Sequence, residues 1–263
     1  MNVSRTRPGP RGRTVLFILV LPAILLASVD LRADGPATSP RSIRNWSFEV
    51  VSGPSLGGPS SDLEAAMRRY GFDDSTHGGW FGSGTSYPYT DDELWVTTSY
   101  WGAARRRLGS GPWHVGLAGG PTGFGIVSGY RETGAGGYTG AYVDAEARMV
   151  TLAPMAWYEP ARGLRLGAGP AIHRVDLELG SMWFSSGSEL FRSYEPGLVV
   201  EAAITVPVDT PVFFIALAQY RWAASATAGP WETTTSSGAR VEFPGTSVSL
   251  SHGFVALGIG GRF

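Results

Sequence analysis

The chain of 263 residues has no cysteine, which excludes disulfide bonds, thiolate metal ligands and cysteine nucleophiles. Its 21 basic residues are balanced by 22 acidic ones and form no basic block, which argues against a nucleic-acid partner. The four histidines lie far apart, without the short spacings of a metal site. We therefore expect no enzyme activity, and no catalytic residue, cofactor or metal ion.

Long apolar runs are also missing, because no segment reaches the roughly 20 residues that a membrane-spanning helix needs. A shorter apolar run over residues 15–26 follows four arginines within the first 13 residues. This is the layout of a secretory signal peptide. We predict a signal peptide over residues 1–33, cleaved near residues 27–33, and a single domain over residues 34–263. The alternative is a retained membrane anchor.

Eight segments show the period-two alternation or the β-rich composition of strands. Most of them exceed the roughly 9–11 residues that a tilted strand needs to cross a bilayer. Abundant glycine (37 residues) and tryptophan (nine residues) suit tight turns and membrane-interface positions. The segments span residues 46–52, 94–105, 113–127, 143–158, 164–175, 193–207, 212–223 and 248–263.

The connections between these segments alternate between short and long. The short ones cover residues 107–112, 159–163 and 209–211. The long ones cover residues 53–93, 128–142, 176–192 and 224–247. In outer-membrane barrels the short turns face the periplasm and the long loops face outside. The alternation therefore predicts an all-β fold, an eight-stranded antiparallel transmembrane up-and-down barrel with both termini in the periplasm.

One short helix is predicted over residues 61–70, in the first long connection. Ser61 and Glu64 have the spacing of a capping box, and Gly71 ends the helix. Its apolar face consists of Leu63, Ala66, Met67 and Tyr70. We expect this helix over or beside the extracellular mouth of the barrel, with the membrane interface as the alternative.

The carboxyl-terminal strand alternates up to its last residue, with one face formed by Val255, Leu257, Ile259 and Phe263. This ending resembles the C-terminal signature of bacterial outer-membrane β-barrels, and the chain is similar to small OmpA-transmembrane and OmpX-like barrels. Gly261 departs from the usual pattern of larger apolar residues. The resemblance implies export to the outer membrane, contact with its lipid or lipopolysaccharide, and recognition of these four residues by the barrel assembly machinery.

Several strands carry charged residues on one face. An arginine that faces lipid near mid-membrane costs about 2–4 kcal/mol, so we predict that these faces point into the barrel. On segment 143–158 this leaves Ala145, Ala147 and Met149 facing lipid. Eight strands enclose a space just wide enough for side chains, so the charges should pair and fill it. The predicted lumen network consists of Glu146, Arg148, His173, Glu195, Glu201 and Arg221. Gln219 is expected on the same inward face, with His114, Arg165 and Arg262 nearer the periplasmic end.

These features favour an outer-membrane barrel without catalysis, which acts as a structural element or through its loops. One alternative is a narrow pore or transporter for small solutes. Another is a lipid-modifying enzyme that uses Ser249 or Ser251 with His252, although Ser251 and His252 point to opposite faces of a strand. A fourth hypothesis is a component of a surface assembly, with a partner docked on the first loop.

Overall fold

The computed structural model describes residues 45–72, 97–132, 140–180, 188–208, 210–234 and 240–263. The predicted signal peptide and its cleavage region lie outside the described residues.

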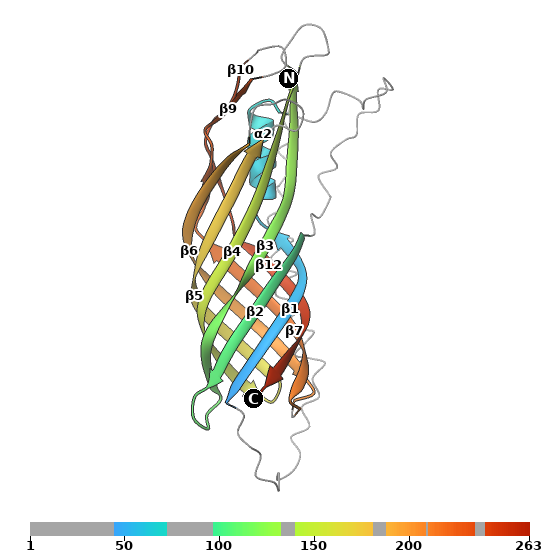
Figure 1. Ribbon diagram of the computed structural model, residues 1–263, viewed down its shortest axis with the longest axis vertical. Helices are drawn as coiled ribbons and strands as arrows, with labels where there is room; N and C mark the ends of the chain where they lie inside the picture. Colours follow the sequence, from blue (N-terminus) through green and yellow to red (C-terminus); the bar gives the residue numbers. More distant parts are fainter. Residues whose placement is uncertain (1–44, 73–96, 133–139, 181–187, 209, 235–239) are drawn as a thin grey trace, which may run out of the picture. The chain divides into compact units, whose positions relative to one another are not determined.

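Eight antiparallel strands close into a barrel (Figure 1). Each strand pairs with the next in the chain, and the last strand closes on the first, with Val50 opposite Ile259. The predicted eight-stranded antiparallel barrel is confirmed. The strands are β1 (Trp46–Gly57), β2 (Thr97–Arg107), β3 (Trp113–Glu132), β4 (Gly140–Ala161), β5 (Leu164–Gly180), β6 (Glu189–Val206), β7 (Val212–Ala223) and β12 (His252–Arg262).

Four neighbouring strands are longer than the others. β3 to β6 have 20, 22, 17 and 18 residues, whereas the remaining four strands have 11 or 12. The extra length rises beyond the end of the barrel at which the long connections lie, here called the loop end (Figure 1). The prediction of loops over residues 128–142 and 176–192 is therefore partly wrong. Arg131 still pairs with Ala141, and Leu179 still pairs with Glu189.

The opposite end of the barrel, here called the turn end, carries the short connections. Gly109 and Gly163 have φ values of 58° and 81°, a left-handed conformation that favours glycine in tight turns. Arg107 stabilises the first turn by donating from Nε to the carbonyl of Gly111 at 3.0 Å.

The predicted helix is present as α2 (Ser60–Arg69). The capping-box prediction is wrong: Pro59 occupies the N-cap position, and no side chain caps the helix. Glu64 instead pairs with Arg68 at 2.5 Å, one helical turn away. Gly71, at φ 77°, follows the last turn as expected. With 10 residues, α2 is too short to cross a membrane, and no other described segment is a helix that could do so.

The last long connection also has secondary structure, although we expected a loop. Its four short strands pair as two small sheets, β8 with β11 and β9 with β10. The large side chains of Trp231 and Phe243 are no more than 3% exposed. Burial of these two apolar side chains stabilises the folded segment. The strands are β8 (Ala226–Ala228), β9 (Trp231–Thr234), β10 (Arg240–Phe243) and β11 (Thr246–Val248).

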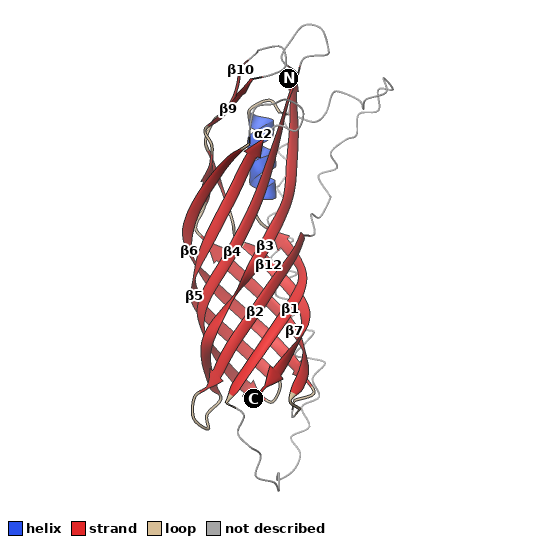
Figure 2. Ribbon diagram, viewed as in Figure 1, coloured by secondary structure: helices blue, strands red, loops and turns tan. Residues whose placement is uncertain are grey.

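The rising parts of β3 to β6, α2 and β8 to β11 together form a structure that we call the cap (Figure 2). α2 lies so close to β3 that a Cβ atom on Gly129 would come within 3.0 Å of the Met67 sulfur. The apolar core of the cap includes Leu63, Ala66, Met67, Phe72, Val127, Val143, Ala145, Ala147, Met149, Val175, Leu177, Leu179, Trp231, Phe243, Val248 and Leu250.

Below the cap, in the barrel section, the outer surface is apolar on all eight strands. Because side chains alternate across a strand, every second residue faces outward, and many of these outward residues are large, apolar and exposed. We call this surface the apolar belt. It consists of Trp46, Phe48, Val50, Tyr100, Trp113, Val115, Leu117, Val150, Leu152, Tyr158, Leu166, Ile172, Tyr194, Leu198, Val200, Val206, Val212, Phe214, Trp222, Leu257, Ile259 and Phe263.

Candidate functional site: the barrel interior and the cap

The barrel section is filled by buried ion pairs, the first of which joins Glu49 of β1 to Arg165 of β5. Arg165 donates from Nη1 to Oε2 of Glu49 at 2.7 Å and from Nη2 to Oε1 at 2.5 Å. Arg105 of β2 lies 3.7 Å from the same carboxylate. The three side chains are at most 4% exposed. A buried carboxylate requires such a partner, and the bidentate geometry is the strongest that arginine offers.

Glu201 of β6 is the second buried carboxylate of this layer. It accepts hydrogen bonds from Arg165 Nη2 at 3.1 Å, from Trp157 Nε1 at 2.6 Å and from Gln219 Nε2 at 3.1 Å. With Glu49 and Arg105, these residues come from six of the eight strands. The network therefore joins opposite walls of the barrel and fills its cross-section.

Arg221 of β7 forms a second layer, nearer to the loop end. Its Nε donates to Gln219 at 2.5 Å, and its Nη1 donates to the hydroxyl of Thr122 at 2.6 Å. The guanidinium carbon lies 4.5 Å from the ring centroid of Trp101 and 4.9 Å from that of Phe254. Cation–π contacts with these two aromatic rings thus help to stabilise the buried charge of Arg221. Gln219 links this layer to Glu201.

His173 lies in the same region and is fully buried. Its Nδ1 is 2.9 Å from the hydroxyl of Thr151, and its Nε2 is 3.2 Å from the carbonyl of Trp222. Glu195 lies opposite His173 in the strand register and is half-buried. Of the six residues predicted for the lumen network, His173, Glu201 and Arg221 are therefore buried inside the barrel.

The prediction for Glu146 and Arg148 is wrong, because both lie on the outer surface of β4. They pair with each other at 2.6 Å, and their side chains are 29% and 63% exposed. Ala145, Ala147 and Met149, predicted to face outward, are the buried residues of this segment. This part of β4 belongs to the cap, where the inner face packs against apolar residues and the outer face is open.

Three members of the network, Glu49, Arg105 and Trp157, were not predicted from the sequence. Glu49 lies in the segment that alternates least clearly. Trp157 lies on the same strand face as Ala145 and Met149, which was predicted to face lipid. The available signal was Glu49 itself, a single carboxylate within the otherwise uncharged WSFEVV. One buried acid in a strand implies a basic partner on another strand.

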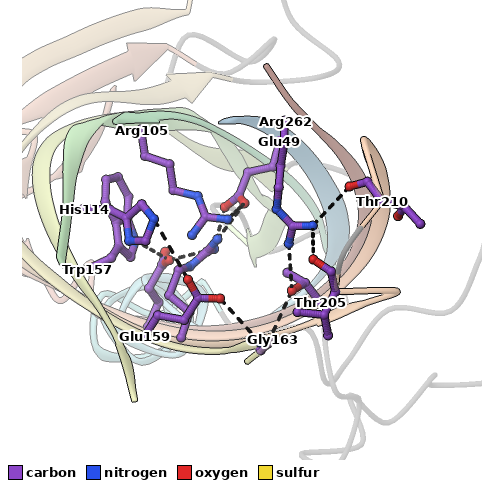
Figure 3. A network of polar contacts seen from close by, with 12 residues as sticks. Glu49, Arg105, His114, Trp157, Glu159, Gly163, Thr205, Thr210 and Arg262 are labelled. Carbon is purple, nitrogen blue, oxygen red and sulfur yellow. Dashed lines mark hydrogen bonds and ion pairs between the residues drawn. The ribbon is translucent and has the colours of Figure 1, made fainter. Parts of the chain in front are cut away.

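Polar contacts also hold the turn end together (Figure 3). Arg262 donates from Nη1 to the carbonyl of Val208 at 2.6 Å. Glu159 accepts from the backbone N–H of Gly163 at 3.4 Å and lies 4.0 Å from His114. These side chains tie strand ends to the adjacent turns.

The serine and histidine residues considered for catalysis do not form a reactive pair. Ser251 Oγ lies 3.2 Å from the backbone nitrogen of Ala223. The Nδ1 atom of His252 lies 2.9 Å from the carbonyl of Leu250, and its ring packs edge-on against Phe124. Among the described residues, no three histidine, aspartate or glutamate side chains are grouped so that they could hold a metal ion.

No protein-family model and no curated protein matches this chain. Several solved structures are similar in outline. Neisserial surface protein A has 9% identity and a TM-score of 0.41, covering 83% of this chain and 96% of its own. Ail, the attachment invasion locus protein of Yersinia pestis, has 11% identity and a TM-score of 0.39, covering 83% and 99%. A major outer membrane protein from Thermus thermophilus has 13% identity and a TM-score of 0.45, covering 83% and 99%. All three TM-scores are below 0.5, so the similarity is one of outline.

Proposed function

We propose that this chain is an outer-membrane β-barrel without catalysis, which acts as a structural element or through the cap that it holds outside the membrane. The observation that carries the proposal is the reversed polarity of the barrel section. Its large apolar side chains face outward and its buried charges face inward, the opposite of a protein surrounded by water.

The height of the apolar belt supports insertion in a bilayer. On β6 the belt runs from Tyr194 to Val206, a distance of 12 residue steps. At about 3.3 Å per residue and a tilt of about 40°, these steps span about 30 Å along the barrel axis. The lipid-facing band of known outer-membrane barrels is about 25 Å tall, so the two agree.

Aromatic residues at both margins of the belt support the same placement. Trp113 and Tyr158 lie at the turn end, with ring centroids 4.9 Å apart, and Trp46 stacks on Phe48 at 6.3 Å. Trp222, at the loop end of β7, is 50% exposed. Tryptophan and tyrosine favour the membrane–water interface, where one side of the ring is apolar and the other is hydrated.

The filled interior favours a barrel that does not conduct over the alternative of a narrow pore. Trp157, Arg165, His173 and Arg221 are all at most 1% exposed, whereas the walls of a water-filled channel would be accessible. Above them, the apolar core of the cap covers the loop end. A pore would require both the polar interior of the barrel and the apolar core of the cap to rearrange.

We also propose that Val255, Leu257, Ile259 and Phe263 are read by the barrel assembly machinery. Leu257, Ile259 and Phe263 are at least 58% exposed on the outer surface, so a lateral partner can reach them. A surface partner at the first loop would meet the charged outer side of α2, since its apolar side is buried in the cap.

Two measurements test the proposed function. Membrane-extracted protein should migrate faster on a gel when unheated than when boiled, because a barrel stays folded in detergent. In planar bilayers it should show no reproducible conductance steps. A single gel position would contradict the barrel in the membrane, and stable channels would contradict the filled interior.

A further inference from the structure

The cap carries a group of charged residues on the outer face of β4, β5 and β6, directly above the apolar belt. We call this group the arginine patch. It surrounds a surface depression of about 250 Å³. The charged residues that line it are Glu146, Arg148, Arg174, Asp176, Glu178 and Arg192.

The charges of the arginine patch are sorted along the strands. Cross-strand register places Arg174 beside Val150 and Tyr194, in the row of the belt that lies nearest to the cap. The next row contains Arg148, Asp176 and Arg192, and the row farthest from the belt contains Glu146, Glu178 and Leu190. Counted from the belt outward, the rows therefore carry net charges of +1, +1 and −2.

The three arginines and three carboxylates of the patch balance in number, and the positive charge lies in the two rows nearest to the belt. Arg174 and Arg192 both donate to a single carboxylate, that of Asp176, at 2.7 and 2.6 Å. Their side chains remain 44% and 47% exposed. Each guanidinium has five N–H donors, and among the described residues each of these two arginines uses one of them for Asp176.

The boundary with the belt is sharp. One row below Arg174 lie Leu152, Ile172 and Pro196, which carry no charge. Successive outward rows are about 7 Å apart along a strand. Tyr194, which is 64% exposed, lies in the row of Arg174 and has the amphipathic character of an interfacial residue.

From this arrangement we infer that the arginine patch binds the phosphate of a phosphorylated lipid in the outward leaflet. This inference rests on the proposed function, because it requires the apolar belt to lie in the bilayer. The acyl chains would lie along Leu152 and Ile172 while the phosphate meets Arg174 and Arg192. The outermost carboxylates would then face water beyond the phosphate layer.

Native mass spectrometry of the folded protein in detergent tests the inference, with diphosphoryl lipid A as the probe. The wild type should retain the lipid, and the Arg174→Gln/Arg192→Gln variant should bind it about 25-fold more weakly, or about fivefold per arginine. Arg174→Lys/Arg192→Lys should recover part of the loss, because lysine keeps the charge without the bidentate geometry.

Arg240→Gln is the matched control, since Arg240 also pairs with a carboxylate, Glu232, but lies on the β9–β10 hairpin. It should bind the lipid like the wild type. Equal binding by the wild type and the double glutamine variant, or an equal loss in Arg240→Gln, would overturn the inference. So would displacement of the lipid by excess inorganic phosphate, which would assign the patch to soluble anions.

Heat-modifiable gel migration of the same samples separates the two proposals. If the double variant still shifts on boiling while its lipid affinity is unchanged, the arginine patch is not a lipid site and the membrane barrel stands. If the wild type itself does not shift, the proposed function fails first.

Discussion

The barrel section and the cap share four strands, β3 to β6, but have opposite polarity. In the barrel section the interior holds ion pairs such as Glu49 with Arg165, and the exterior is apolar. In the cap the interior is apolar, and the exterior holds ion pairs such as Glu146 with Arg148. The difference fits the proposed placement, with lipid around the barrel section and water around the cap.

The change of polarity takes place within one strand. Along the outer face of β4, Glu146 and Arg148 are followed by Val150 and Leu152 without a break in the alternation. The backbone of β4 runs through this boundary as one strand, but its pairing with β3 shifts register between Gly123 and Ile126, which lie opposite Arg148 and Glu146. The change of polarity itself is carried by the side chains. This teaches that the two faces of a strand cannot be assigned from charge until the medium at that height is known.

Among the variants that test the difference between the two sections, Arg165→Met should have the largest effect on the unfolding free energy. It removes the arginine that neutralises Glu49 and Glu201, and leaving a buried charge without its partner costs about 3–5 kcal/mol. Urea unfolding in lipid vesicles, followed by tryptophan fluorescence, should show this loss. Arg148→Met, in the exposed pair of the cap, is the control and should unfold like the wild type. Equal effects would mean that the interior pairs are as solvated as the surface ones.

The second test inserts a charge on the outer face of each section. Leu257→Arg, in the belt, should lower the unfolding free energy by about 2–4 kcal/mol, because it places a guanidinium in lipid. Glu178→Arg, on the outer face of the cap, should change it little, because that side chain meets water. Vesicle unfolding curves measure both. If Leu257→Arg is tolerated as well as Glu178→Arg, the belt does not face lipid.

The third test addresses the cap alone. Met67→Ala empties a buried position between α2 and β3, and should destabilise the cap by about 2 kcal/mol. Limited proteolysis should then cleave the cap faster, while the heat-induced gel shift of the barrel stays unchanged. Glu64→Ala, on the outer side of α2, is the control. Loss of the gel shift in Met67→Ala would show that the two sections do not unfold separately.

The smallest effect is expected at a single tether. Asp62 of α2 accepts a hydrogen bond at 2.7 Å from the backbone N–H of Ser249. Asp62→Asn weakens this bond by about 1 kcal/mol, which corresponds to about fivefold faster hydrogen exchange at Ser249. Exchange at Val248, whose side chain is buried in the apolar core, gives a reference in the same strand segment. Unchanged exchange at Ser249 would show that the hydrogen bond from Ser249 to Asp62 does not stabilise this segment.

Much of the barrel follows from the sequence because its period-two alternation and its turns are local signals. All eight strands were predictable, and the apolar face of α2 at Leu63, Ala66 and Met67 was correct. Residues 128–142 and 176–192, where β3 to β6 extend into the cap, were predicted as loops because polar residues on an outward face look alike in a strand and in a loop.

The interior network was harder to predict because it depends on which strands face each other. His173, Glu201 and Arg221 were recognised from the charged faces of their own strands. Glu49 meets Arg165 from 116 residues away, and no local pattern reports that distance. Predicting that Arg148 faces outward likewise requires knowing where the apolar belt ends along β4.

The tether between Asp62 and Ser249 has a consequence for how the cap forms. It joins positions 187 residues apart, and in an open chain such a contact would carry a large loop-closure entropy. Pairing of β1 with β12 removes most of that cost, because Gly57 and His252, which lie beside the two tethered segments, are neighbours in the register. Closure of the barrel therefore lowers the loop-closure entropy of this contact, as a disulfide bond would in a chain with cysteines. The contact between α2 and the segment at Ser249 then costs little more than the closure of a short loop.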